Sequence, residues 1–269
     1  MQTIRSQDGT RLAYDVYGSG PPLIYVTGAT CFRSFPPIVS DAKALAKAFT
    51  VYNYDRRGRG DSTDTLPYSL ERELEDLLAL IEVAGGKAHV YGHSSGAVLA
   101  LEAALHYPKK LDHVFLYDPA YVHDAAEKAE YASLRAKIET LLAHGQHARA
   151  ITSFLQGIGM PKIVGWLMRF MPGWKTMVAL APTLAYDLSL TADLPPFERA
   201  SQCTIPMHVI AGAKSPAGIR SLSQTLAAKI PKASYDQLAG QGHMVNTKHL
   251  LPLFMRYLTT AAAVGSPSA

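Results

Sequence analysis

Short apolar segments rich in β-branched residues alternate with helical patterns along most of the chain. Apolar runs bounded by turn residues predict strands at 23–26, 50–54, 88–92, 111–117, 207–212 and 234–238. Two further segments, 3–5 and 11–17, flank an Asp-Gly pair that predicts a hairpin. An amphipathic pattern predicts a helix at 69–84. Alanine and lysine spacing predicts one at 41–49, an alanine and leucine run one at 95–106, and a further helix is expected at 219–230. Strands that alternate with helices predict an α/β fold with a mostly parallel, twisted sheet and helices on both faces.

The pattern changes between residues 120 and 200. Two or more helical segments stand where a parallel sheet needs a single crossover, and they are rich in alanine, methionine and aromatic residues. Apolar residues at helical spacing include Tyr131, Leu134, Ile138, Leu141 and Leu142. We interpret 1–119 and 201–263 as an α/β core, 120–200 as an inserted helical cap, and 264–269 as a flexible tail.

A sharp turn joins the strand at 88–92 to the helix at 95–106. The turn reads Gly92-His93-Ser94-Ser95-Gly96. Glycines at its two ends let strand and helix backbones approach closely, while the serine between them is held on a strained turn with its hydroxyl exposed. The amides at the start of the helix point toward the same place. The pattern predicts a nucleophile elbow with Ser94 as the nucleophile.

This strand, elbow and helix are followed about 150 residues later by Gly240-Gln241-Gly242-His243. The combination resembles the α/β-hydrolase superfamily. The resemblance implies that His243, on the loop after the last strand, deprotonates Ser94 and later protonates the leaving group. It also implies an oxyanion hole made by two backbone amides. One is that of Ala29, in a Thr-Gly-Ala turn where the family often has His-Gly-x, and the other is that of Ser95.

The third member of the triad departs from the family's pattern. The acid usually follows the strand at 207–212 as Gly-x-x-Asp, but this chain has Ser215 and no carboxylate there. Asp118 ends the strand beside the elbow strand, and adjacent strands lie only about 4.8 Å apart, so Asp118 can substitute. Haloalkane dehalogenases and certain lipases place their acid at this strand. Two alternatives are a Ser94–His243 dyad, in which Ser215 holds the imidazole, and another carboxylate such as Asp187. Asp118 could instead cap the first helix of the insertion.

Three arginines lie among glycines in the segment 55–62, Asp-Arg-Arg-Gly-Arg-Gly-Asp-Ser. Such a segment could bind phosphate, but the better interpretation is that Asp55 and Asp61 pair with the arginines and brace the turn. The segment is also similar to the structural turn after the fourth strand in many of these hydrolases. The two cysteines, Cys31 and Cys203, are expected at opposite ends of the sheet, as free thiols in a reducing compartment.

Composition narrows the classes of partner. The net charge is only +4 and no long Lys/Arg cluster occurs, which argues against nucleic acid. No run of about 18 apolar residues exists, so no membrane span is expected, and the first residues lack an apolar signal core. We expect a cytoplasmic monomer or homodimer. No metal-ligand cluster is visible, and we expect neither a metal nor another cofactor.

The expected function is hydrolysis of a small hydrophobic carboxylic ester through an acyl-enzyme. A serine nucleophile argues against dehalogenase and epoxide hydrolase chemistry, which uses an aspartate in this family. Candidate pocket residues are Gly28, Thr30, His93, Trp166 and Met244. A carbon–carbon bond hydrolase, a cofactor-free perhydrolase on the same triad, and a non-catalytic protein that binds a small molecule remain alternatives.

Overall fold

The computed structural model describes residues 1–264 and is built around one large sheet. Its strands are β1 (Gln2–Arg5), β2 (Arg11–Tyr17), β3 (Pro22–Val26), β4 (Thr50–Tyr54), β5 (Ala88–His93), β6 (Leu111–Tyr117), β7 (Met207–Gly212) and β8 (Ala233–Leu238). Within the described residues they form an eight-stranded sheet in the order β1-β2-β4-β3-β5-β6-β7-β8. The β1–β2 and β2–β4 pairs are antiparallel, and the remaining neighbouring pairs are all parallel. The predicted hairpin and mostly parallel α/β sheet are confirmed.

Successive residues of the central strands pack into two different cores. In β3, Ile24 belongs to the apolar cluster on one face, while Leu23 and Tyr25 belong to the cluster on the other. β6 alternates in the same way, with Leu116 on the first face and Phe115 on the second. Because both faces of these strands are covered, the strands read as nearly continuous apolar runs in the sequence.

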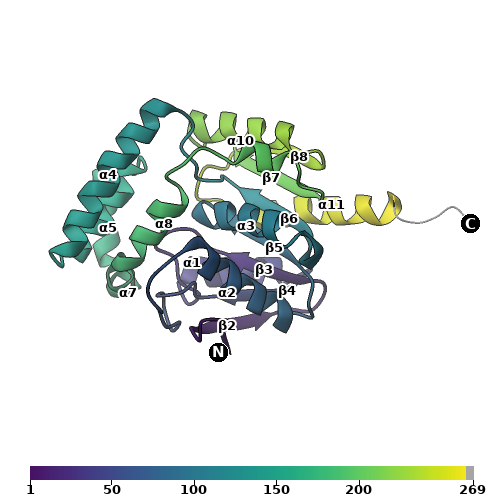
Figure 1. Cartoon of the computed structure of the whole chain (residues 1–269), viewed down its shortest axis with the longest axis horizontal. Helices are drawn as coiled ribbons and strands as arrows, with labels where there is room; N and C mark the ends of the chain where they lie inside the picture. Colours follow the sequence, from purple (N-terminus) through teal and green to yellow (C-terminus); the bar gives the residue numbers. More distant parts are fainter. Residues whose placement is uncertain (265–269) are drawn as a thin grey trace, which may run out of the picture.

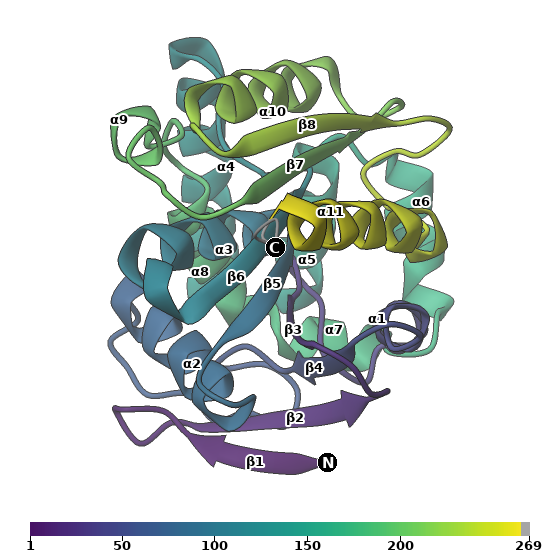
Figure 2. The same ribbon diagram turned by 90° about the vertical axis from the view of Figure 1, so that its right-hand side faces the viewer.

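Helices cover both faces of the sheet (Figure 2). α2 (Leu70–Val83), α3 (Ser95–His106) and α10 (Ala217–Lys229) contribute to the first core, and α1 (Pro36–Leu45) and α11 (Leu250–Val264) to the second. Short 3₁₀ turns are η1 (Pro108–Lys110), η2 (Met168–Phe170), η3 (Ala181–Thr183) and η4 (Thr247–His249). Among these residues no helix combines the length and apolar character needed to cross a bilayer.

Two predicted helices have the wrong bounds. Alanine and lysine spacing predicts a helix at 41–49, but α1 begins at Pro36 and ends at Leu45. Proline suits the first helical turn, whose amides have no partner within the helix, so the Pro-Pro pair starts this helix rather than preceding it. The helix predicted at 219–230 begins two residues earlier and ends at Lys229.

Residues 125–200 form the helices α4 (Ala125–Ala143), α5 (His147–Gly157), α6 (Lys162–Leu167), α7 (Trp174–Ala179), α8 (Leu184–Leu190) and α9 (Phe197–Ala200). Figure 1 shows α4, α5, α7 and α8 gathered to one side of the sheet. Asp124 caps α4 by accepting a hydrogen bond from the Glu127 amide, so Asp118 is not the cap of this helix. Of the predicted tail, Val264 is the last residue of α11, and residues 265–269 lie outside the described residues.

Cys31 and Cys203 are both free cysteines. Burial raises the pKa of the Cys31 thiol to about 11, so this thiol is protonated at neutral pH. A packing role for Cys31 agrees with this environment better than a nucleophilic one.

Candidate active site

The turn between β5 and α3 has the geometry that the glycine spacing predicts. Ser94 lies between the two elements with φ 58° and ψ −122°. A Cβ atom on Gly92 would lie 2.3 Å from the Gly96 carbonyl oxygen, and one on Gly96 would lie 2.2 Å from the Val26 carbonyl oxygen. Neither position has room for a side chain, because strand and helix backbones meet there.

Three non-glycine residues with positive φ lie at the edge of the sheet that is formed by the C-terminal ends of its parallel strands. They are Thr30 (φ 61°), Ser94 (φ 58°) and Asp118 (φ 45°). Each follows the C-terminal end of a strand, and these strands, β3, β5 and β6, are neighbours in the sheet. A strained backbone of this kind costs on the order of 1–3 kcal/mol per residue and tends to cluster at functional sites. The strain therefore marks this edge as the candidate site.

Ser94, His243 and Asp118 form a hydrogen-bonded chain at this edge. The Ser94 Oγ lies 3.2 Å from His243 Nε2, and His243 Nδ1 lies 3.1 Å from Asp118 Oδ2. Asp118 is fully buried, and the Gly212 amide donates to its Oδ1 at 3.1 Å. The Ser215 hydroxyl donates to Oδ2 at 2.5 Å. A buried carboxylate with these donors can hold the imidazole in one orientation.

Ser215 and Asp187, the two alternatives to Asp118 as the group that holds the imidazole, have other hydrogen-bond partners. Ser215 donates to Asp118, and within the described residues no hydrogen bond joins it to the imidazole of His243. Asp187 lies on α8, where it pairs with Arg56 and Arg59. The carboxylate that contacts the imidazole is therefore that of Asp118.

The loop that carries His243 is held by two side chains from the sheet. His93 Nε2 lies 2.8 Å from the His243 carbonyl oxygen, and the Tyr117 hydroxyl donates to the Gly242 carbonyl at 2.6 Å. Because a carbonyl can only accept, the Nε2 of His93 carries the proton. Burial is the main cause that lowers the pKa of His93 to about 4, and the charge of the nearby His243 lowers it further. His93 is therefore neutral at pH 7. Sequence reasoning predicted a pocket wall at His93 and missed this contact.

The predicted oxyanion donors flank the nucleophile. A Cβ atom on Gly28 would lie 3.0 Å from Ser94 Cβ, so the Thr27–Ala29 turn lies directly against Ser94. Within residues 1–264, neither the Ala29 amide nor the Ser95 amide donates to a protein acceptor. An anionic oxygen bound beside Ser94 could accept from both amides.

The predicted pocket residues differ in their surroundings. Gly28 and Thr30 lie on the turn beside Ser94, and Thr30 is buried. Trp166 and Met244, in contrast, are 52% and 68% exposed. The ring of Trp166 packs against that of Phe170. Contact of any of these residues with substrate stays a prediction.

The expected pairing of Asp55 and Asp61 with the arginines of their own segment is wrong. Both aspartates form ion pairs with Arg33 instead. Asp55 also accepts hydrogen bonds from the Arg33 and Asp61 amides, and its carboxylate lies under Gly60. Both carboxylate oxygens of Asp55 therefore have partners outside the three arginines of the segment.

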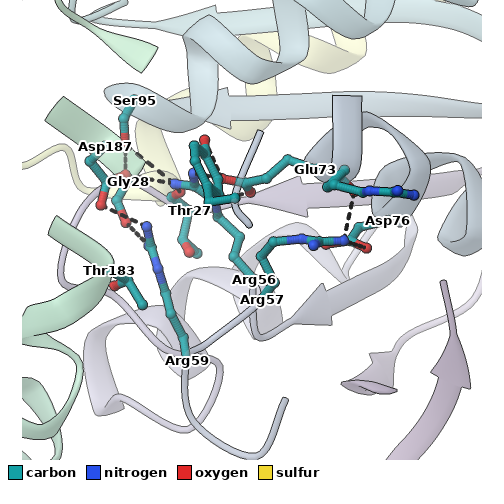
Figure 3. Close-up of polar contacts among 12 residues, drawn as sticks. Thr27, Gly28, Arg56, Arg57, Arg59, Glu73, Asp76, Ser95, Thr183 and Asp187 are labelled. Carbon is teal, nitrogen blue, oxygen red and sulfur yellow. Dashed lines mark hydrogen bonds and ion pairs between the residues drawn. The ribbon is translucent and has the colours of Figure 1, made fainter. Parts of the chain in front are cut away.

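Arg56, Arg57 and Arg59 point into the protein, where their partners come from distant elements (Figure 3). Arg56 pairs with Glu73 of α2 and with Asp187 of α8, and Arg59 pairs with the other oxygen of Asp187. Arg57 pairs with Asp76, again from α2, and with Asp8. All three arginines are at most 1% exposed, so they are not available to a phosphate in solution.

Comparisons with known proteins agree with this geometry. The model of the alpha/beta hydrolase family matches residues 17–250. The crystal structure of an alpha/beta hydrolase from Sphaerobacter thermophilus is 39% identical, with a TM-score of 0.86 over 96% of this chain and 100% of that one. The enol-lactonase of Burkholderia xenovorans, 22% identical with a TM-score of 0.71 over 96% of this chain and 100% of its own, shares the fold.

A protein of Caulobacter segnis, provisionally named carbamate hydrolase RutD, is 26% identical over 217 residues, which are 75% of this chain and 77% of that protein. The family model covers most of the chain, and the Sphaerobacter hydrolase matches nearly all of it. The chain belongs to the alpha/beta hydrolase family.

Proposed function

We propose that this protein is a serine hydrolase that cleaves a carboxylic ester through an acyl-enzyme. Ser94 is the nucleophile, His243 the general base and acid, and Asp118 the group that orients the imidazole. The observation that carries the proposal is the chain of contacts from Ser94 Oγ to His243 Nε2 (3.2 Å) and from His243 Nδ1 to Asp118 Oδ2 (3.1 Å).

In the acylation half-reaction, Ser94 Oγ attacks the ester carbonyl carbon while its proton passes to His243 Nε2. The carbonyl oxygen becomes an anion, and the amides of Ala29 and Ser95 donate to it. When the intermediate collapses, the bond between the carbonyl carbon and the alkoxy oxygen breaks. The leaving alcohol takes the proton from His243, and the acyl group stays on Ser94.

Deacylation repeats these steps with water. A water molecule attacks the acyl carbon as His243 takes one of its protons, and the same amides hold the second oxyanion. The bond to Ser94 Oγ then breaks, and Oγ recovers a proton from His243. Asp118 accepts from Nδ1–H throughout, which keeps Nε2 directed at the reacting atoms.

We propose a hydrophobic acyl or alcohol group for the substrate, with residues 120–200 acting as a cap over the site. Two observations support this. The turn that carries Ala29 leads into the buried Phe32 and Phe35, and both rings lie against Gly173 at the start of α7. Two similar proteins are named as an enol-lactonase and a carbamate hydrolase, and a lactone, a carbamate and an ester all carry a heteroatom leaving group on a carbonyl carbon.

Intact-mass measurement after incubation with a fluorophosphonate tests the proposal. We expect one adduct on the native protein and none on the Ser94→Ala variant, together with turnover of p-nitrophenyl esters that depends on acyl length. Folded native protein that forms no adduct would overturn the proposal in favour of a binding protein. Adduct formation without ester turnover, but with cleavage of a carbon–carbon bond or formation of a peracid, would replace the ester substrate class.

A further inference from the structure

The carbonyl of Gly28 and the amide of Ala29 belong to one peptide group. A peptide group is planar and trans, so its C=O and N–H bonds point in opposite directions. Arg59 Nη1 donates to the Gly28 carbonyl oxygen at 2.8 Å. This contact holds the carbonyl on the side of Arg59, and the Ala29 N–H is therefore fixed on the opposite side. A cation at the carbonyl end also polarises the peptide group, which strengthens its N–H as a donor.

Asp187 holds Arg59 in place and also reaches the second oxyanion donor. Its Oδ2 accepts from Arg59 Nη2 at 2.7 Å, and its Oδ1 accepts from the Ser95 hydroxyl at 2.7 Å (Figure 3). Ser95 is the first residue of α3, and its amide is the second proposed donor. One carboxylate on α8 thus connects to both backbone segments that flank Ser94.

Arg56 completes the arrangement from the other side. Its Nη1 donates to Asp187 Oδ1 at 2.8 Å and contacts the Thr27 carbonyl and the Ser95 hydroxyl, each at 3.4 Å. Arg56, Arg59 and Asp187 are each 1% exposed. Burial alone would raise the pKa of Asp187, but Arg59 and then Arg56 lower it below its ordinary value, so Asp187 stays ionised. Charges this deeply buried are screened little by salt.

We infer that Arg59, anchored by Asp187 of α8, is a positioning residue for the oxyanion hole. The inference rests on the proposed function, because it needs the Ala29 and Ser95 amides to bind the oxyanion. It also connects the inserted helices to catalysis: α8 supplies the carboxylate that holds both donors, so the hole is complete only when α8 is docked on the core. Arg59 and Asp187 touch neither Ser94 Oγ nor His243 and act only through the backbone they hold.

The test compares three variants of the full-length protein: Arg59→Met, Asp187→Asn and Arg57→Met. Arg57 is the matched control, because it is a fully buried arginine of the same loop. Its ion-pair partners are Asp76 and Asp8, and neither belongs to the Thr27–Ala29 turn. Loss of one oxyanion donor costs about 10²–10³ in turnover, and loss of its orientation should cost about 10- to 100-fold. We expect kcat to fall by that factor in Arg59→Met and Asp187→Asn with KM changed less than threefold, and kcat to stay near native in folded Arg57→Met.

A spectroscopic measurement separates positioning from general loss of structure. A trifluoromethyl ketone labelled with ¹³C at its carbonyl forms a hemiketal with Ser94 Oγ, and the proton of Oγ passes to His243. The oxyanion of this adduct occupies the hole, so its ionisation pH reports on the two amides. We expect that pH to rise by about one unit in Arg59→Met and Asp187→Asn and to stay unchanged in Arg57→Met.

An unchanged kcat and an unchanged hemiketal ionisation in folded Arg59→Met and Asp187→Asn would overturn the inference. If Arg59→Met does not fold, Asp187→Asn carries the same comparison, because asparagine has nearly the same size as aspartate. Failure of the proposed function looks different: the native protein itself would then form neither the hemiketal nor the fluorophosphonate adduct.

Discussion

The Ser215 hydroxyl donates to the same oxygen of Asp118 that contacts His243. The Ser215 Oγ lies 2.5 Å from Asp118 Oδ2, and the His243 Nδ1 lies 3.1 Å from it. Ser215 stands where the family's acid is usually found, and in this chain it supports the carboxylate of a neighbouring strand. The serine therefore donates a hydrogen bond to the carboxyl group that contacts His243 and does not take its place.

Asp118→Asn should remove most of the activity. The amide can present its NH₂ group to His243 and favour the wrong tautomer, a change that costs about 10⁴ in the turnover of serine proteases. We expect a loss of about 10³- to 10⁴-fold in kcat in ester assays. Ser215→Ala should retain kcat within about tenfold and lower the free energy of unfolding by about 1–3 kcal/mol, because one donor to a buried carboxylate is lost. A severe loss in Ser215→Ala alone would show that Asp118 is not the acid.

His93→Phe should reduce kcat by about tenfold. The ring would fill the same space, but it cannot donate to the His243 carbonyl as His93 Nε2 does. His93→Gln keeps an amide donor and should retain most of the activity. Steady-state kinetics on the two variants decide the point, and equal rates in His93→Phe and the native protein would exclude a positioning role for His93.

Three buried histidines should make the protein less stable in acid. His89, His113 and His208 lie side by side on β5, β6 and β7, with ring centroids 5.5 Å and 5.3 Å apart. Burial lowers the pKa of His89 to about 4 and that of His208 to about 3, and it also lowers the pKa of His113. Between about pH 6.5 and pH 4 the unfolded chain binds protons that the folded protein does not. The stability that these histidines contribute is therefore complete above about pH 6.5 and is lost as the pH falls.

The His89→Phe variant tests this dependence. His89 Nδ1 is buried without a hydrogen-bond partner in the described part of the chain, so phenylalanine should fit there. Urea unfolding between pH 6.5 and pH 4 should show a decline in stability that is less steep by up to about 1.4 kcal/mol per pH unit, the contribution of one proton. The matched control is His144→Gln at the exposed residue that follows α4, which should leave the slope unchanged. Equal slopes in His89→Phe and the native protein would contradict the prediction.

Gly96→Ala should destabilise the fold at the elbow itself. The added Cβ would lie 2.2 Å from the Val26 carbonyl oxygen, so β3 and α3 must move apart. We expect the free energy of unfolding to fall by about 1–3 kcal/mol, as at other overpacked sites, and thermal melting measures this change. Gly165→Ala on α6 is the control, because its Cβ would meet nothing within 4 Å and alanine favours a helix. A Gly96→Ala variant as stable as the native protein would show that the close approach is relaxed at little cost.

Local patterns were enough to predict the sheet and the elbow. Buried parallel strands are continuous apolar runs, and the glycines around Ser94 are required by backbone contacts a few residues away. Because β5 and β6 are neighbours, Asp118 lies beside Ser94, and this made Asp118 one of the candidate acids; the structure shows that Asp118 contacts His243. The catalytic roles of Ser94, His243 and Asp118 stay predictions that the variants above test.

The partners of the arginines could be found only from the tertiary structure. Sequence proximity suggested Asp55 and Asp61, but Arg56 and Arg59 pair with Asp187, 131 and 128 residues further along the chain. Nothing in the pattern of residues indicates that Asp187 pairs with Arg56 and Arg59. The choice is made by the docking of α8 against α3, which places one carboxylate between two buried guanidinium groups. The sequence by itself determined the strands of the sheet and the position of the elbow that carries Ser94, because those depend on neighbours along the chain. Only the tertiary structure decided which charged residues pair. A buried charge needs an oppositely charged partner, and the packing of the helices determines which partner lies close enough.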